Sequence, residues 1–95
     1  FSNGGNGVIQ QFKIAPNPAT DFTVISFELA ENAEAVSTLQ ILDGRGQLLE
    51  ANQVASRAGD NRYELATSNW SGGMYVAYLC NGEEVLAKKF VVLRP

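Results

Sequence analysis

The sequence predicts an all-β fold, an antiparallel sandwich or barrel of about seven short strands. Short runs alternate between apolar and polar residues, turn signals recur about every 8 to 14 residues, and no helical periodicity extends beyond about one turn. The chain has 95 residues, of which 45% are hydrophobic and 18% are charged. This composition indicates one folded domain with a core of packed side chains.

Residues 1–7 have the composition of a flexible joint. They hold three of the nine glycines and no charged residue, which is typical of a linker from an upstream segment. A solvated N-terminal tail is the alternative.

The expected strands follow the alternating runs. The clearest run places Ile25, Phe27 and Leu29 on one face of a strand. Between residues 29 and 36 the composition favours a helix, but the segment is short and lies between two alternating runs, so we expect a loop. In order along the chain, the expected strands cover residues 8–14, 22–29, 35–42, 47–54, 62–66, 74–80 and 84–93.

Turn residues separate these strands. Pro16 and Pro18 fix two φ angles and withhold two backbone donors, which predicts a rigid lead into the second strand. Residues 43–46 begin with Asp-Gly and residues 81–82 are Asn-Gly, and both pairs predict hairpin turns. We expect residues 57–61 to form a loop.

The charge pattern argues against two classes of partner. The net charge is −3, and the basic and acidic residues are interspersed. No basic stripe is available for phosphates or anionic lipids, and the apolar runs are far shorter than the ~20 residues of a membrane span. We therefore expect no nucleic-acid partner and no direct membrane insertion.

Residues for catalysis or metal binding are scarce. The chain has no His and one Cys, so we expect no catalytic residues, no metal site and no cofactor, and we do not expect an enzyme. Trp70 has two interpretations: it stacks on a sugar or a protein partner, or it lies at the edge of the core, which a small sandwich favours.

The order of the turn and strand motifs is more specific than any one of them. Pro16-Asn17-Pro18-Ala19-Thr20-Asp21 precedes a strand, and a series of later motifs ends in Lys88-Lys89-Phe90-Val91-Val92. Over about residues 12 to 95, this order closely resembles the C-terminal sorting domain of type IX secretion. The residues that match its motifs are Pro16, Asn17, Pro18, Asp21, Gly46, Gly73, Tyr75, Lys88, Lys89, Val91 and Arg94.

The resemblance implies an immunoglobulin-like sandwich of about seven antiparallel strands that directs an attached cargo across the outer membrane. Residues 1–11 would then be a linker and the start of the first strand, leading from an upstream cargo domain, and residues 12–95 the sorting domain. The implied partners are the type IX translocon of the outer membrane, a sortase-like protease and the cargo, with a homodimer left open. The protein would pass through the periplasm to the cell surface or the medium.

The resemblance also implies processing. A sortase-like protease would remove the domain, and the cargo would be attached to surface lipopolysaccharide. Cleavage is expected in the accessible segment Ser2, Asn3, Gly4, Gly5, Asn6 and Gly7.

Two further hypotheses concern the last strand and the function of the domain. The last strand would offer a translocon a row of free backbone groups and a positive charge. The alternative function is an accessory module of a secreted hydrolase that binds carbohydrate or protein through Trp70, Tyr75 and Tyr78. Against it, Tyr75 and Tyr78 are three residues apart on one strand and should face opposite sides.

Overall fold

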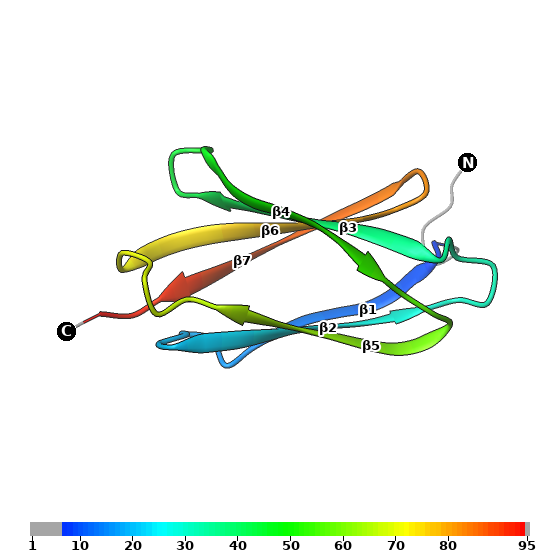
Figure 1. Ribbon diagram of the computed structural model, residues 1–95, viewed down its shortest axis with the longest axis horizontal. Helices are drawn as coiled ribbons and strands as arrows, with labels where there is room; N and C mark the ends of the chain where they lie inside the picture. The colour runs from blue at the N-terminus through cyan, green and yellow to red at the C-terminus, as the bar shows by residue number, and fades with distance from the viewer. Residues whose placement is uncertain (1–6, 95) are drawn as a thin grey trace.

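A computed structural model describes residues 7–94, and these residues form seven antiparallel β-strands in two packed sheets. Figure 1 shows the four-stranded sheet above the three-stranded sheet. The strands are β1 (Ile9–Ala15), β2 (Phe22–Leu29), β3 (Val36–Asp43), β4 (Leu48–Ala55), β5 (Gly59–Ala66), β6 (Gly73–Asn81) and β7 (Glu84–Val92). The predicted all-β, immunoglobulin-like sandwich is confirmed.

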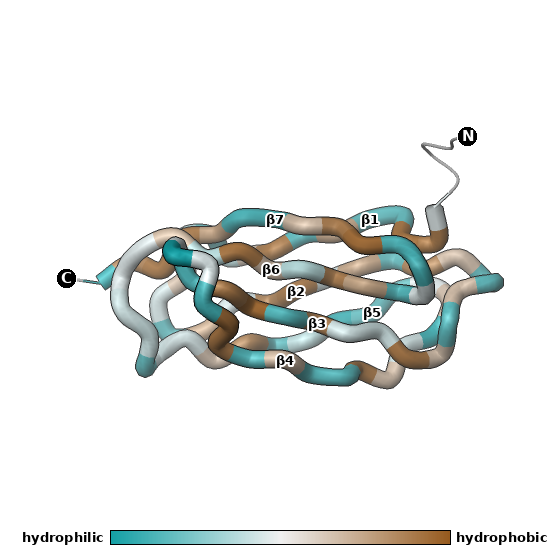
Figure 2. The backbone as a smooth tube through the Cα atoms, turned by 90° about the horizontal axis from the view of Figure 1, so that it is seen from above, coloured by the Kyte–Doolittle hydropathy of each residue, from teal (hydrophilic) through white to brown (hydrophobic). Residues whose placement is uncertain are grey.

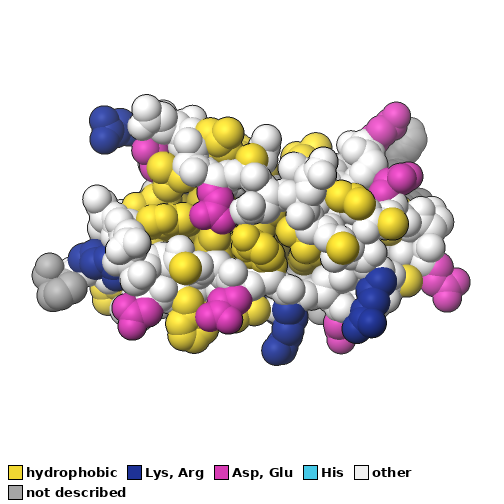
Figure 3. All heavy atoms as spheres, in the orientation of Figure 1, with side chains coloured by type: hydrophobic (Ala, Val, Ile, Leu, Met, Phe, Trp, Pro, Cys, Tyr) yellow, Lys and Arg dark blue, Asp and Glu magenta, His cyan; other side chains and the backbone are white. Residues whose placement is uncertain are grey.

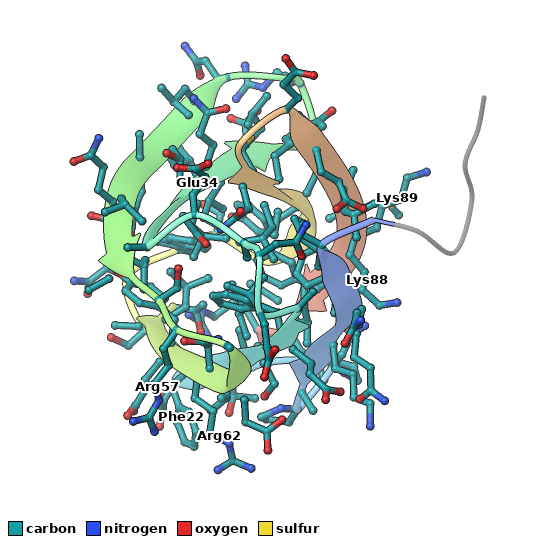
Figure 4. All side chains as sticks on the ribbon, turned by 90° about the vertical axis from the view of Figure 1, so that its right-hand side faces the viewer. Phe22, Glu34, Arg57, Arg62, Lys88 and Lys89 are labelled. Carbon is teal, nitrogen blue, oxygen red and sulfur yellow. The ribbon has the colours of Figure 1, made fainter. Side chains whose placement is uncertain are left out.

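The strand order is β1-β2-β5 in one sheet and β4-β3-β6-β7 in the other. Seen end-on, the edge strands β1 and β7 lie on the same side of the sandwich, and β4 and β5 lie on the opposite side (Figure 4). No helix of the described residues has the length and apolar character needed to cross a membrane.

The core lies between the sheets because the inward residues of each strand are apolar. On β2, Ile25, Phe27 and Leu29 are buried and alternate with half-buried residues, as the sequence predicts. The buried side chains from the other strands include Leu39, Ile41, Leu65, Ala77, Leu79, Phe90 and Val92.

Most strand ends match the sequence-based expectation to within one residue, but the start of β5 is three residues earlier. The prediction of a loop over residues 57–61 was wrong in its second half. Gly59, Asp60 and Asn61 pair with Leu29, Glu28 and Phe27, so β5 pairs with β2 over its whole length. Backbone pairing with a long neighbouring strand therefore extends β5 through residues whose composition favours a loop. The segment between β2 and β3 contains turns and no helix, as predicted.

The β6–β7 hairpin turns at Gly82 and Glu83, because Asn81 and Glu84 are the last paired residues. Gly82 has a φ of +60°, and the Asn81 side chain turns inward, where it is 2% exposed. Its Nδ2 atom donates to Glu34 O at 3.1 Å and to Ser37 Oγ at 2.9 Å, and its Oδ1 atom accepts from Glu34 N at 2.9 Å. Asn81 therefore ties the hairpin to the loop before β3.

Candidate functional site

Segments that are distant in the sequence meet at one end of the sandwich. Strands β1, β3, β5 and β7 all run toward this end, at the left of Figure 1, so the loops that follow the first three lie beside the C-terminal residues. We call this the C-terminal end, defined by residues 16–21, 43–47, 67–75 and 90–94. It contains all the predicted motif residues except Lys88 and Lys89.

The loop between β1 and β2 is hydrogen-bonded to the last strand. Ala19 N donates to Val91 O at 2.7 Å, and Leu93 N donates to Ala19 O at 2.8 Å, which forms a parallel bridge between Ala19 and Val92. Ala19 is fully buried. The proline-containing segment therefore covers the outer edge of β7 through a single β-bridge.

Asn17 adds a side-chain bond to the same edge. Its Oδ1 atom accepts a hydrogen bond from Val91 N at 2.9 Å. Pro16 and Pro18 flank it, both after cis peptide bonds, and the Pro16 carbonyl accepts from Thr23 Oγ1 at 2.7 Å. The first and the last sequence motifs are thus in direct contact.

Arg94 joins three segments through its guanidinium group. Nε donates to Trp70 O at 2.9 Å, Nη1 donates to Thr20 O at 2.8 Å, and Nη2 donates to Thr67 O. A planar guanidinium presents several donors in a fixed fork, so it satisfies carbonyls that approach from different directions. We call these contacts the Arg94 clamp.

Thr67 reinforces the clamp. Its Oγ1 atom donates to Thr20 O at 2.9 Å, and its N–H donates to Asp21 O at 2.9 Å. The motif residue Asp21 contributes to this cluster through its backbone carbonyl, while its side chain is exposed. Thr20 O thereby accepts from both Arg94 and Thr67.

Three aromatic rings lie beneath these loops. The ring centroids of Trp70 and Tyr75 are 5.0 Å apart, those of Tyr75 and Phe90 5.7 Å, and those of Trp70 and Phe90 6.4 Å. Tyr75 is 6% exposed, and its hydroxyl donates to Ser71 O at 2.6 Å. Trp70 is half-buried, so the core-edge interpretation of this residue is confirmed. Close contacts of this kind add about 0.5–1.5 kcal/mol per pair beyond the burial of area.

The β3–β4 turn lies beside the aromatic rings. Asp43 Oδ1 accepts hydrogen bonds from Arg45 N and Gln47 N, each at 2.9 Å. These bonds hold the pKa of the Asp43 carboxyl below its ordinary value of 3.8, and the bond from Gln47 N has the largest effect. The left-handed residue of the turn is the motif residue Gly46, with a φ of +87°; Gly44, which the Asp-Gly pair had suggested, does not take a positive φ.

A groove of about 450 Å³ separates this turn from the β5–β6 loop. Asp43, Arg45, Leu49, Trp70 and Met74 are among its lining residues. The motif residue Gly73, the first residue of β6, also lines this groove and has a φ of +149°. A Cβ on the neighbouring Gly72 would lie 3.3 Å from Arg94 Cβ, so glycine allows the loop to approach the clamp closely.

Lys88 and Lys89 lie away from the C-terminal end, along β7. Both side chains extend outward on the side of the sandwich where β7 lies next to β1 (Figure 4). Lys89 pairs with Val76 and lies on the outer face of the sheet. Lys88, one residue away, occupies an inward-facing position, and its side chain reaches solvent beside the edge of the sheet.

The row of free backbone groups on β7 is interrupted, because both the N–H and the carbonyl of Val91 are bonded to the β1–β2 loop. The platform of Trp70, Tyr75 and Tyr78 does not form, since Tyr75 is buried and Tyr78, at an outward-facing position of β6, lies on the opposite face of the sheet.

The expected cleavage segment lies outside the described residues except for Gly7, which precedes β1 at the far end of the sandwich.

Sequence reasoning missed Ala19, Thr20 and Thr67. Ala19 and Thr20 were part of the first motif but were assigned no role, and the single signal for Thr67 is a small hydroxyl residue directly after a strand. All three act through backbone groups, which a residue type does not reveal, and Thr67 adds a bond from its side chain.

These features define a small β-sandwich whose final residues are built into a cluster of loops. In comparison with known families, residues 13–93 match the family described as the secretion system C-terminal sorting domain. The chain belongs to this family of type IX secretion sorting domains, whose members are sorting signals and not catalysts.

The comparison with curated proteins gives no match. Among solved structures, the chain is similar to part of a β-glucosidase from Listeria innocua in complex with glucose, with a TM-score of 0.48 and 14% identity. The match covers 86% of this chain and 16% of the β-glucosidase.

Proposed function

We propose that this domain carries an attached cargo through the outer membrane and that the export machinery binds its folded C-terminal end. One observation is the main support for this proposal. Most of the residues that the sequence assigns to the family motifs lie at this end, where Arg94 donates to Trp70 O, Thr20 O and Thr67 O. A receptor at this end would contact several motifs at once, and the shape that it binds would exist only in the folded domain.

The proposal is tested by export of a reporter. The whole chain is fused to the C-terminus of a periplasmic reporter in a host that has the type IX machinery. We expect the reporter at the cell surface or in the medium, and we expect retention in the periplasm when residues 91–95 are removed. Undiminished export of the shortened fusion would contradict the proposal.

A second experiment separates the folded end from a linear tail signal. Arg94→Ala leaves residues 91–93 in place but removes the donors that hold the loops together. If the machinery binds the folded end, export of the fusion falls strongly with Arg94→Ala and is partly retained with Arg94→Lys. Equal export of all three fusions would assign the signal to the tail alone.

We further propose that a sortase-like protease cleaves within residues 2–7 and attaches the cargo to surface lipopolysaccharide. The start of β1 limits the accessible segment, because Ile9 N donates to Glu84 Oε1 at 2.9 Å. The start of β1 lies at the opposite end of the sandwich from the Arg94 clamp (Figure 1). The protease and the translocon could therefore bind the domain together.

Mass spectrometry of the exported cargo tests the processing. A cargo C-terminus between residues 2 and 7, with an added lipopolysaccharide mass, is expected. In a host whose sortase-like protease is inactive, the full fusion should remain uncleaved. A cleavage point after residue 9 would contradict the assignment.

A further inference from the structure

The outer face of the four-stranded sheet is nearly free of charge. We define this face by the residues of β3, β4, β6 and β7 that alternate with the core residues, and Figure 2 views the sheet from this side. The register places them in rows across the sheet, such as Leu42–Val76–Lys89 and Gln40–Tyr78–Ala87. Among the described strand residues on this face, Lys89 is the only charged one.

The outer face of the three-stranded sheet has the opposite character. Its rows pair Lys13 and Arg62 with Ser26, and Glu28 with Asp60. Figure 3 shows this contrast from the side: charged side chains follow the lower rim, over β2 and β5, whereas the upper rim carries charge mainly near its two ends. The domain therefore has one face suited to water and one that is depleted of charge.

The apolar side chains of the charge-poor face are accessible. Val36 is 48% exposed, Met74 51% and Val85 55%. Four strands of eight or nine residues cover about 19 Å by about 28 Å, a footprint of roughly 500 Å². This is the area of the whole face, polar residues included, and the largest patches on soluble domains, which are of similar size, often have a function. A standard interface buries ~800 Å² on each partner, so a partner on this face would also reach the neighbouring C-terminal end.

Lys89 indicates what kind of surface covers this face. The described residues of the face include no Asp or Glu, so a second copy packed face to face would offer Lys89 no counter-charge. A buried unpaired ammonium is costly, and a partner with a carboxylate at this point would remove that cost. The face is also continuous with the C-terminal end, because Met74 pairs with Val91 next to the Arg94 clamp.

We propose that a protein of the export machinery docks on this face through an apolar surface with a carboxylate placed opposite Lys89. The inference rests on the proposed export function and extends the recognition surface from the C-terminal end over β6 and β7. It also assigns roles within the last motif: Lys89 and Val91 contact the partner, while Phe90 and Val92 belong to the core.

The test compares matched substitutions on the two faces in the full reporter fusion. Val76 and Val24 are both half-buried and point outward from a central strand, one on each sheet. Lys89 and Lys13 are both exposed lysines on edge strands. We expect Val76→Lys and Lys89→Glu to lower export at least ~10-fold, since an unpaired charge buried in an interface is costly. Val24→Lys and Lys13→Glu should keep export within about twofold of the parent.

The variants must be folded for their export to report on docking. Circular dichroism and protease resistance of each purified fusion show whether it is folded, and Met74→Lys, at a more exposed position, replaces Val76→Lys if that variant unfolds. Normal export of the folded Met74→Lys and Lys89→Glu fusions would overturn the docking face and leave the export function intact. Failure of the parent fusion to be exported would instead refute the proposed function.

Sedimentation of the fusions separates the partner from self-association. A parent fusion that is monomeric, with an export defect in Lys89→Glu, supports the export partner. A parent dimer that Val76→Lys or Met74→Lys converts to a monomer would assign the face to a second copy and overturn the proposal.

Discussion

Arg94 Nη1 lies 2.8 Å from the carbonyl oxygen of Thr20, seventy-four residues earlier in the chain. The same guanidinium reaches Trp70 O and Thr67 O. The C-terminal residues are therefore part of the fold, and Arg94 binds carbonyl oxygens of the loops around it. The residues after β7 therefore stabilise the loops, in addition to being a candidate export signal.

Loss of the Arg94 clamp should destabilise the domain. We expect Arg94→Ala to lower the free energy of unfolding by about 1.5–3 kcal/mol, because it removes hydrogen bonds from a charged donor to three carbonyls. Arg94→Lys should lose less, since an ammonium retains part of this bonding. Urea denaturation measures both, with Arg57→Ala at an exposed position as the control. A loss no larger than that of Arg57→Ala would show that the clamp contributes little.

Asn17 should protect one amide at the edge of β7. Its Oδ1 atom accepts from Val91 N, so Asn17→Ala leaves this N–H without its partner and should cost about 0.5–1.5 kcal/mol. Hydrogen exchange followed by NMR should show faster exchange at Val91, with little change at Leu79 in the core. The exposed Asn32→Ala serves as the control, and unchanged exchange at Val91 would contradict the assignment.

Asn81 should contribute more to the stability of the fold than its place beside a turn suggests. Asn81→Ala removes one acceptor and two donors from a buried site, and Glu34 N loses its partner. We expect a loss of about 1–3 kcal/mol and, from thermal denaturation, a decrease of roughly 4–8 °C in Tm per kcal/mol. Asn32→Ala should change Tm little; equal Tm values for the two variants would refute this role.

Asp43 should make the β3–β4 turn sensitive to acid. Its pKa is lowered in the folded state, mainly by the hydrogen bond from Gln47 N. A carboxyl group with a lowered pKa stabilises the fold above the ordinary value of 3.8, and this contribution is lost as the pH falls through the folded-state pKa. In an NMR titration, the Asp43 carboxyl should titrate below an Asp in an unfolded peptide, and the Gln47 amide should follow the same midpoint. Asp43→Asn should remove that amide transition; a midpoint at or above 3.8 would contradict the prediction.

The strands could be predicted from the sequence because their signal is local. Ile25, Phe27 and Leu29 alternate with less apolar residues, and burial follows the same alternation. Where pairing overrides local preference, prediction fails: β5 begins at Gly59 because its neighbour β2 continues to Leu29. The Asn81-Gly82 pair predicted a hairpin correctly, but the inward turn of Asn81 depends on Glu34 and Ser37, which are distant in the sequence.

By itself, the sequence determined the all-β class, the positions of most strands and the order of motifs that places the chain among sorting domains. These properties depend on alternation, turn residues and motif order, all of which are local or linear. The tertiary structure alone decided that Asn17 and Arg94 belong to one cluster of loops and that one sheet face is depleted of charge. Each depends on strand pairing and on backbone carbonyls brought together by folding, and a carbonyl is present in every residue whatever its type.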